Sequence, residues 1–282
     1  MDIYSHPIFL VQGNAFSGPE NPERFSTSRR FVENAERGYS KGDDEDPEML
    51  SKIESMHSYL EELRLVGAGY KAIDHEKETL VDRLSYRTAI AAAMTAIYAA
   101  EARGFALVRP PGHHAHRDFT HGYCLLNNMA LATKQLIENG ERVLVLDLDV
   151  HHGCGTEELL ESERDVQMIS LYKKGLWPKE DHFANADNCL HLALEDSMTD
   201  ERYLRIFADS ALPAINSFDP TVIGISLGLD TFAEEKFGWE LTPKVLRTVR
   251  QLLRRRQLFG VLEGGYYPGS VSTGLAAFTT DP

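Results

Sequence analysis

The 282-residue sequence is poor in cysteine and has no long apolar run. Its three cysteines, Cys124, Cys154 and Cys189, form no C-x-x-C pair and are too few, and odd in number, for a disulfide framework. No apolar run approaches the roughly 18 residues of a membrane span, and no basic segment followed by an apolar stretch opens the chain. We therefore expect a protein of a reducing, cytoplasmic compartment with no membrane partner.

Positive charge is also scarce. The chain has 29 Lys and Arg against 43 Asp and Glu, a formal net charge of −14, which disfavours binding to a nucleic-acid backbone. Acidity of this kind attracts cationic molecules, although it also serves solubility alone. The one basic run, residues 254–256, ends an expected helix, where cations complement the helix dipole. We expect no nucleic-acid partner.

Hydrophobic residues make up 43% of the chain, enough for one large core, and we predict a single domain over residues 1–282. Apolar strands alternate with helices through the second half, which predicts a three-layer α/β/α fold with a mostly parallel central sheet. Strands are expected at 3–4, 105–108, 143–149, 166–171, 190–194, 221–227 and 258–262, and helices at 23–38, 47–57, from about 58, 85–103, 125–139, 156–163, 200–217 and 242–256. Loops are expected at 6–22, 41–47 and 67–79.

The central stretch of the sequence is residues 143–156, where four apolar residues precede a cluster of acids and histidines. Strand alternation places Asp147, Asp149 and His151 on one side, at the carboxyl end where open parallel sheets bind ligands. A charged strand end facing solvent is the simpler alternative. Unpaired charge at a half-buried site is costly unless a cation compensates, so we interpret the cluster as half of a metal site.

Three further strand ends carry reactive groups. Asp230 follows the strand at 221–227, and Asp149, His151 and Asp230 together would leave an open fourth position, as in catalytic zinc sites. The tandem His113 and His114 follow the strand at 105–108 and titrate near working pH, so they are proton-transfer groups.

The last of these strand ends is Glu263-Gly-Gly-Tyr266. Tyr266, on a Gly-Gly turn, can donate a hydrogen bond to a developing oxyanion. Each motif alone is weak evidence for a catalytic site. Their joint occurrence at strand ends predicts hydrolysis of an amide by metal-activated water.

Taken together, the motifs resemble those of the histone deacetylase and acetylpolyamine amidohydrolase family, which has the arginase/deacetylase fold. The resemblance implies that Asp149, His151 and Asp230 bind zinc and that Tyr266 polarises the scissile carbonyl. It is carried by Arg109-Pro-Pro-Gly-His-His-Ala115, Gly122-Tyr-Cys-Leu-Leu-Asn-Asn128, Asp147-Leu-Asp-Val-His-His-Gly153, Ser226-Leu-Gly-Leu-Asp-Thr-Phe232 and Glu263-Gly-Gly-Tyr266.

The resemblance assigns further roles. It implies that Asp147 pairs with His113 and that Arg24 belongs to an internal acetate path. A structural potassium ion is implied at Asp147, Ser170 and the backbone carbonyls of Asp149, His151 and Leu171. The substrate tunnel is expected to involve Tyr123 with His121, Gly122, Phe232 and Gly265.

The sequence departs from the family pattern in three places. Cys154 stands where relatives usually carry Asp or Asn, a residue that orients His114. His121 replaces a small residue beside Tyr123, where it would narrow the pocket mouth or supply a polar contact. A long loop that shapes the polyamine channel in acetylpolyamine amidohydrolases is missing between residues 59 and 85, which leaves polyamine specificity open.

Two other functions were weighed. An arginase-type ureohydrolase binds two bridged manganese ions and needs a second Asp two residues after Asp230. Residue 232 is Phe in this sequence, which disfavours that function. A catalytically weak acyl-lysine or polyamine sensor would have lost a metal ligand or Tyr266, and all four are present.

We predict a zinc-dependent amidohydrolase that removes an acyl group, first of all acetyl, from an acetylated amine. Ferrous iron is the alternative metal, because two carboxylates and one imidazole tolerate both ions. Acetylpolyamines and acetyl-lysine remain open as substrates, and the oligomeric state is open, with a homodimer as one option.

The thiol of Cys154 is a weaker partner for an imidazole than a carboxylate is, so we expect His114 to be less basic than in relatives. Cys154→Asp is expected to raise the pKa of His114 and so to shift the limb of the pH–rate profile that reports this residue to higher pH. An unchanged profile in the variant would refute this expectation.

Overall fold

The computed structural model describes residues 1–10, 19–37, 46–66, 71–72, 79–179, 182–237 and 239–280. Parts of the loops expected at 6–22, 41–47 and 67–79 lie outside these ranges. Among the described residues, no helix combines the length and apolar character needed to cross a membrane.

The centre of the fold is an eight-stranded sheet in the order β2-β1-β5-β10-β9-β6-β7-β8, and every strand pair in it is parallel. Its middle strands are apolar and buried throughout, because helices cover both faces. The strands are β1 (Ile3–Ser5), β2 (Glu36–Arg37), β5 (Phe105–Ala106), β6 (Val143–Asp147), β7 (Val166–Lys173), β8 (Cys189–Leu194), β9 (Val222–Leu227) and β10 (Gln257–Leu262). A separate antiparallel pair joins β3 (Lys71–Ala72) to β4 (Leu80–Val81).

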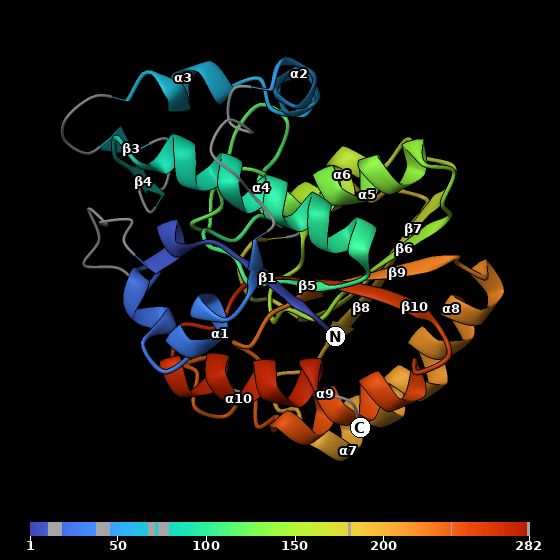
Figure 1. Cartoon of the computed structure of the whole chain (residues 1–282). Helices are drawn as coiled ribbons and strands as arrows, with labels where there is room; N and C mark the ends of the chain where they lie inside the picture. Colours follow the sequence, from blue (N-terminus) through green and yellow to red (C-terminus); the bar gives the residue numbers. More distant parts are fainter. Residues whose placement is uncertain are drawn as a thin grey trace.

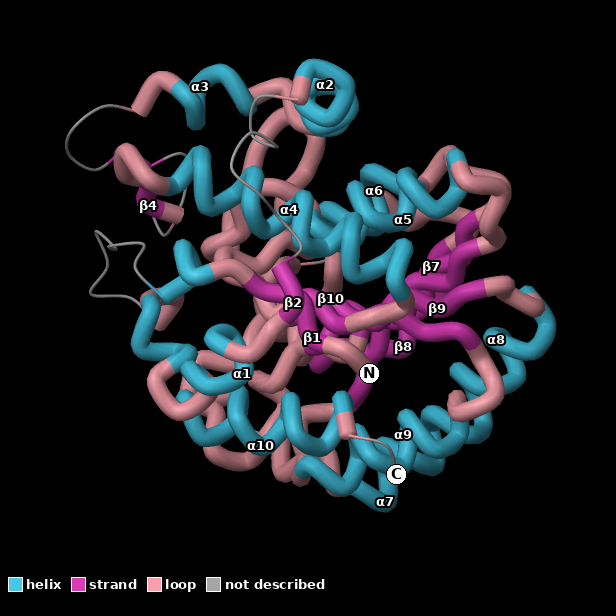
Figure 2. The backbone as a smooth tube through the Cα atoms, viewed as in Figure 1, coloured by secondary structure: helices cyan, strands magenta, loops and turns pink. Residues whose placement is uncertain are grey.

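Helices form a layer on each side of the sheet, which confirms the predicted α/β/α architecture (Figures 1 and 2). One layer contains α4 (Ser85–Ala102), α5 (Asn128–Glu138) and α6 (Cys154–Leu160). The other contains α7 (Asp200–Ile206), α9 (Pro243–Leu252) and α10 (Pro268–Thr279), with α8 (Leu212–Phe218) at the sheet's end. Alanine dominates α4, and its small side chains allow close packing against the sheet and α5. The helices α2 (Pro47–Met56) and α3 (Leu60–Arg64) lie outside α4 and confirm the predictions at 47–57 and from 58.

The prediction of one helix over residues 23–38 was wrong. The chain forms a 3₁₀ helix at Pro22–Phe25, a short helix α1 at Arg29–Glu33 and then the edge strand β2. Residues 26–28, Ser-Thr-Ser, form a turn between the helices, because such side chains compete for backbone groups and favour turns over helix interiors. Pairing with β1 then draws residues 36–37 into the sheet.

Two helical segments in the second half also differ from expectation. The helix predicted over 200–217 contains a π-helical turn at Phe207–Ala211, and Pro213 stands in the first turn of α8. Helix α10 was missed, since its Gly, Ser and Thr residues have weak helix propensity. Its burial beneath the sheet stabilises it in place of propensity.

His57, at the C-terminal end of α2, joins three segments on the α4 side of the sheet. Its side chain is buried, its Nδ1 lies 2.9 Å from the carbonyl oxygen of His116, and its Nε2 accepts the backbone N–H of Asn127 at 3.0 Å. These contacts require a neutral ring with the proton on Nδ1. Burial lowers the pKa of His57 to about 4, from an ordinary value of 6.5.

The pKa of His57 is lower in the folded chain than in the unfolded chain. Between these two pKa values the unfolded chain therefore binds more protons, and the free energy of unfolding falls as the pH falls. Between pH 6.5 and about 4, His57 is expected to cost the native state about 3 kcal/mol. Denaturant titrations at both pH values should show a smaller loss in His57→Gln than in the wild type. The exposed His182→Gln is the control, and equal losses in His57→Gln and wild type would contradict the assignment.

Candidate active site

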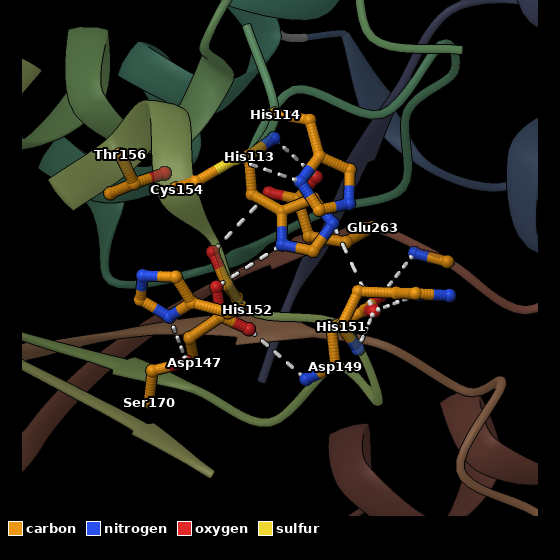
Figure 3. A network of polar contacts seen from close by, with 12 residues as sticks. His113, His114, Asp147, Asp149, His151, His152, Cys154, Thr156, Ser170 and Glu263 are labelled. Carbon is orange, nitrogen blue, oxygen red and sulfur yellow. Dashed lines mark hydrogen bonds and ion pairs between the residues drawn. The ribbon is translucent and has the colours of Figure 1, made fainter. Parts of the chain in front are cut away.

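The parallel sheet brings the predicted motifs to one edge. Asp147, the last residue of β6, is in register with Ser226 of β9 and Ser170 of β7. The strand β10 lies beside β9, so the Glu263–Tyr266 turn follows at the same edge. Figure 3 shows the tandem histidines, the aspartates of the β6 end and Glu263 converging there.

Asp149, His151 and Asp230 form a compact group in which the two carboxylates are buried and His151 is half-buried. The Nδ1 of His151 lies 3.0 Å from Asp149 Oδ1 and 3.2 Å from Asp230 Oδ2. Asp230 Oδ2 is buried, and within the described part of the chain it receives no well-directed hydrogen bond. Two buried carboxylates share a single imidazole, which can neutralise at most one of their charges, so the residues present fit a divalent cation.

The pKa shifts in this group follow from the crowding of charge. Burial, reinforced by the neighbouring Asp149, raises the pKa of Asp230 to about 6. Burial opposes ionisation of Asp149 too, but His113 and His151 outweigh it and hold the pKa of Asp149 below its usual range. For His151, burial is overcome by Asp149 and Asp230, which raise its pKa to about 9.

The tandem histidines lie beside this group, with ring centres 3.9 Å apart and ring planes tilted by 39°. The Nδ1 of His113 lies 3.1 Å from Asp147 Oδ2, the contact that the resemblance implied. Glu263 orients the same loop, because its Oε2 accepts the backbone N–H groups of Gly112 and His113 at 2.7 and 3.1 Å. The sequence singled out the motif of Glu263 but assigned this side chain no role.

The environments of the two rings differ. Burial alone would lower the pKa of His113, but Asp149 and Asp147 raise it to about 10. Burial, helped by His113 and His121, lowers the pKa of His114 well below its ordinary value. The Sγ of Cys154 lies 3.5 Å from His114 Nδ1, and the expectation that this thiol makes His114 less basic than in relatives stays a prediction.

A cavity of about 450 Å³ opens onto these groups, within the range of small-molecule sites. Sequence reasoning missed Trp177 and Phe237, which lie in loops without a recognisable motif; the ring of Phe237 stands 4.8 Å from that of His151. The lining residues are His113, His114, Gly122, Tyr123, Asp149, His151, Trp177, Phe237 and Tyr266.

Three residues expected in the substrate tunnel are not among the lining residues. Phe232 is buried in the core beneath the site. Gly265 lies in the turn before Tyr266, with its carbonyl bonded to Arg24. His121 is buried behind the wall, with its ring 4.5 Å from that of Trp177, so it neither narrows the mouth nor contacts the cavity.

Gly122 shapes one wall because no side chain fits there. Its φ is +58°, and a Cβ would lie 2.7 Å from His114 Cδ2 and 2.8 Å from Trp177. The left-handed backbone and the close approach both require glycine. The turn leaves Tyr123 facing the cavity, with its ring 5.8 Å from that of Tyr266 in an edge-to-face arrangement.

Tyr266 is supported from beneath by Arg24. The guanidinium of Arg24 lies 4.7 Å from the ring centre of Tyr266 and donates to the carbonyls of Gly265 and Glu263 at 2.8 and 2.6 Å. It also pairs with the buried Glu20. Burial raises the pKa of Tyr266 well above its ordinary value, so the hydroxyl stays protonated and can donate. The acetate path expected at Arg24 stays a prediction.

The residues expected at the potassium site lie side by side at the ends of β6 and β7. Asp147 Oδ1 accepts the backbone N–H of Asp149 at 3.0 Å, and Ser170 Oγ lies 3.0 Å from His152 Nδ1. Leu171 follows Ser170 in β7, and His151 follows in the loop after β6. Potassium itself stays a prediction.

The fold and site define an α/β protein with a metal-type group of carboxylates and imidazoles at the carboxyl edge of a parallel sheet. The family model of the histone deacetylase domain matches residues 18–281. The chain therefore belongs to the histone deacetylase family.

Individual relatives agree with this membership. Histone deacetylase 6 of Caenorhabditis elegans is 40% identical over 181 residues, 58% of this chain and 19% of that protein. Polyamine deacetylase HDAC10 of Mus musculus is 30% identical over 246 residues, 80% of this chain and 37% of that protein. The crystal structure of the HDA15 HD domain matches with a TM-score of 0.82 at 26% identity, covering 98% of this chain and 87% of that one. The chain thus spans less than half the length of these two curated relatives.

Gly264 offers a test of the metal-type group. Its backbone N–H donates to Asp149 Oδ2 at 2.9 Å, and a Cβ there would lie 2.3 Å from Asp230 Oδ2. Gly264→Ala should displace both carboxylates and weaken binding of the ion held by Asp149, His151 and Asp230 at least tenfold, measured by metal titration followed by atomic spectrometry. Gly140→Asn, in open space at a φ that Asn tolerates, is the control and should keep its metal. Full metal content in Gly264→Ala would show that the ion binds elsewhere.

Proposed function

We propose that this protein is a zinc-dependent amidohydrolase that removes an acetyl group from an acetylated primary amine. The observation that carries the proposal is the arrangement around one cavity. There, the Asp149–His151–Asp230 group, the tandem His113 and His114, and the protonated hydroxyl of Tyr266 all meet.

Asp149, His151 and Asp230 are the residues that would hold the zinc ion. Two carboxylate oxygens and one imidazole nitrogen suit zinc, with ferrous iron as the alternative. Zinc at this position would act as a Lewis acid toward the amide carbonyl and toward water.

The remaining steps belong to side chains of the chain. His113, backed by Asp147, and His114 face the cavity as the groups that take a proton from attacking water and return it to the departing amine. Tyr266 donates a hydrogen bond to the amide oxygen as negative charge develops there. Arg24 and Glu263 hold the loops that carry Tyr266 and His113, so their role is to position these groups.

For the substrate, we propose an acetyl group on an unbranched alkyl amine. The aromatic rings of Tyr123, Trp177 and Phe237 line the cavity and suit an alkyl chain, which both acetyl-lysine and acetylpolyamines present. One relative is named a polyamine deacetylase, which supports an acetylpolyamine, and another is named a histone deacetylase, which supports acetyl-lysine. The net charge of −14 favours an amine that becomes cationic once freed. We further propose a structural potassium ion at Asp147 and Ser170.

Acetate release tests the function. The zinc-loaded protein should release acetate from an acetylated polyamine or an acetyl-lysine peptide, and a chelator should abolish the release. Tyr266→Phe should lower kcat by about 10²–10³ through loss of the oxyanion donor. Tyr267→Phe, the exposed neighbour, is the matched control and should keep wild-type turnover.

The outcomes separate the alternatives. Chelator-sensitive turnover of the polyamine alone would assign a small-molecule enzyme, and preference for the peptide a protein deacetylase. Absence of release by the zinc-loaded protein, with bound substrate detectable by calorimetry, would refute the hydrolase and indicate a sensor.

A further inference from the structure

A second group of ligand-type atoms lies behind the tandem histidines. The Sγ of Cys154 lies 3.2 Å from His116 Nε2, 3.5 Å from His114 Nδ1 and 3.6 Å from His121 Nε2. The Nε2 atoms of His116 and His121 are 3.2 Å apart. We call these four residues the thiol–imidazole cluster, and all four are buried. Figure 3 shows Cys154 beside His114.

Two distant parts of the chain build this cluster. Cys154 is the first residue of α6, and the three histidines come from the loop that follows β5. Helix α6 is tied to that loop, because the backbone N–H groups of Gly155 and Thr156 donate to the carbonyl of His113 at 3.0 and 3.1 Å. The sulfur is therefore held against the rings by the backbone.

Hydrogen bonding alone accounts poorly for this convergence. A thiol has one proton, so Cys154 can donate to only one of the three ring nitrogens that surround it. The Nδ1 of His116 is paired with the carboxylate of Glu158, which places a proton on Nδ1 and leaves Nε2 with a lone pair toward the sulfur. A carboxylate behind a ring is the usual support of a metal-binding histidine.

The spacing fits a tetrahedral ion. With Zn–S of about 2.3 Å and Zn–N of about 2.0–2.1 Å, tetrahedral angles put sulfur roughly 3.6 Å from each nitrogen and the nitrogens roughly 3.3 Å apart. The three distances from Sγ, 3.2–3.6 Å, and the 3.2 Å between the Nε2 atoms of His116 and His121 agree with these values within a few tenths of an ångström. The ligand atoms of Cys154, His114 and His121 all lie within 4.8 Å of one another, close enough to share one ion.

A neighbouring cluster of two histidines and a glutamate provides a contrast. Glu157 lies between His152 Nε2 and His191 Nε2, each 2.9 Å from a carboxylate oxygen. The backbone N–H groups of Ala184 and Ala186 also donate to this carboxylate, at 3.3 and 2.9 Å. The negative charge of Glu157 is fully hydrogen-bonded by these donors, so this group needs no cation.

We propose that the thiol–imidazole cluster binds a second divalent transition-metal ion of the zinc type. Its ligands are the sulfur of Cys154, a ring nitrogen of His121 and Nδ1 of His114, whose ligand atoms lie within 4.8 Å of one another, and His116 Nε2 lies beside them at 3.2 Å from the sulfur. Binding releases the thiol proton to solvent and leaves a thiolate on the metal. Thiolate and imidazole select zinc-like ions over calcium and magnesium, which take oxygen ligands.

His114 would then belong to two sites at once. With Nδ1 on the metal, the other ring nitrogen carries a hydrogen and faces the cavity as a donor. The exchange of protons with the substrate then falls to His113, whose Nδ1 is backed by Asp147. This consequence rests on the proposed function, whereas the metal site itself does not.

Cobalt substitution tests the site without reference to activity. Protein produced with Co²⁺ should carry two metal ions per chain and show an intense near-ultraviolet thiolate-to-cobalt absorption. The site of Asp149, His151 and Asp230 contains no sulfur and cannot give this band. Asp149→Asn should therefore lose one ion and keep the band, which separates this proposal from the proposed function.

Single substitutions identify the residues that bind the second ion and give the absorption band. Cys154→Ser should lose one ion per chain and the band, and His121→Gln should weaken binding of the second ion at least tenfold while leaving the thiol in place. Cys189→Ser, which removes a cysteine outside the cluster, is the matched control and should keep both ions. A single ion per chain without the band in the wild type, or a band that persists in Cys154→Ser, would overturn the proposal.

Discussion

The site depends on two like charges brought together in a buried place. Asp149 and Asp230 follow neighbouring strands of a parallel sheet, and the imidazole of His151 lies between them. Burial and Asp149 raise the pKa of Asp230 to about 6, in keeping with two like charges held close together in a buried place. Such an arrangement is costly in an empty site and favourable around a cation, so binding and architecture are coupled.

Buried charged side chains also position the loops around this pair. Glu263 holds the backbone of Gly112 and His113, and Glu20 joins two buried arginines, Arg24 and Arg109. Through Arg24 this ionic group reaches the carbonyls of the turn that carries Tyr266. Preorganised loops matter because a catalytic group must stand within a fraction of an ångström of its productive position.

The thiol–imidazole cluster lies directly behind the wall of the cavity. His114 presents one face of its ring to the cavity and its Nδ1 to Cys154. Trp177 packs against both His114 and His121, so the wall of the cavity and the cluster share side chains. A change in the cluster is therefore expected to reach the cavity through His114, without contact with the substrate.

The sequence by itself determined the parallel sheet and the groups at its edge, because apolar strands and the polar residues that end them are local patterns. Tertiary structure decided the rest. Residues 36–37 became a strand through pairing with β1, and α10 formed through burial despite weak propensity. The cavity walls at Trp177 and Phe237, the burial of Phe232 and the meeting of His116 and His121 with Cys154 depend on how loops pack. Loop packing brings together residues that are distant in the sequence, so a local sequence pattern cannot predict it.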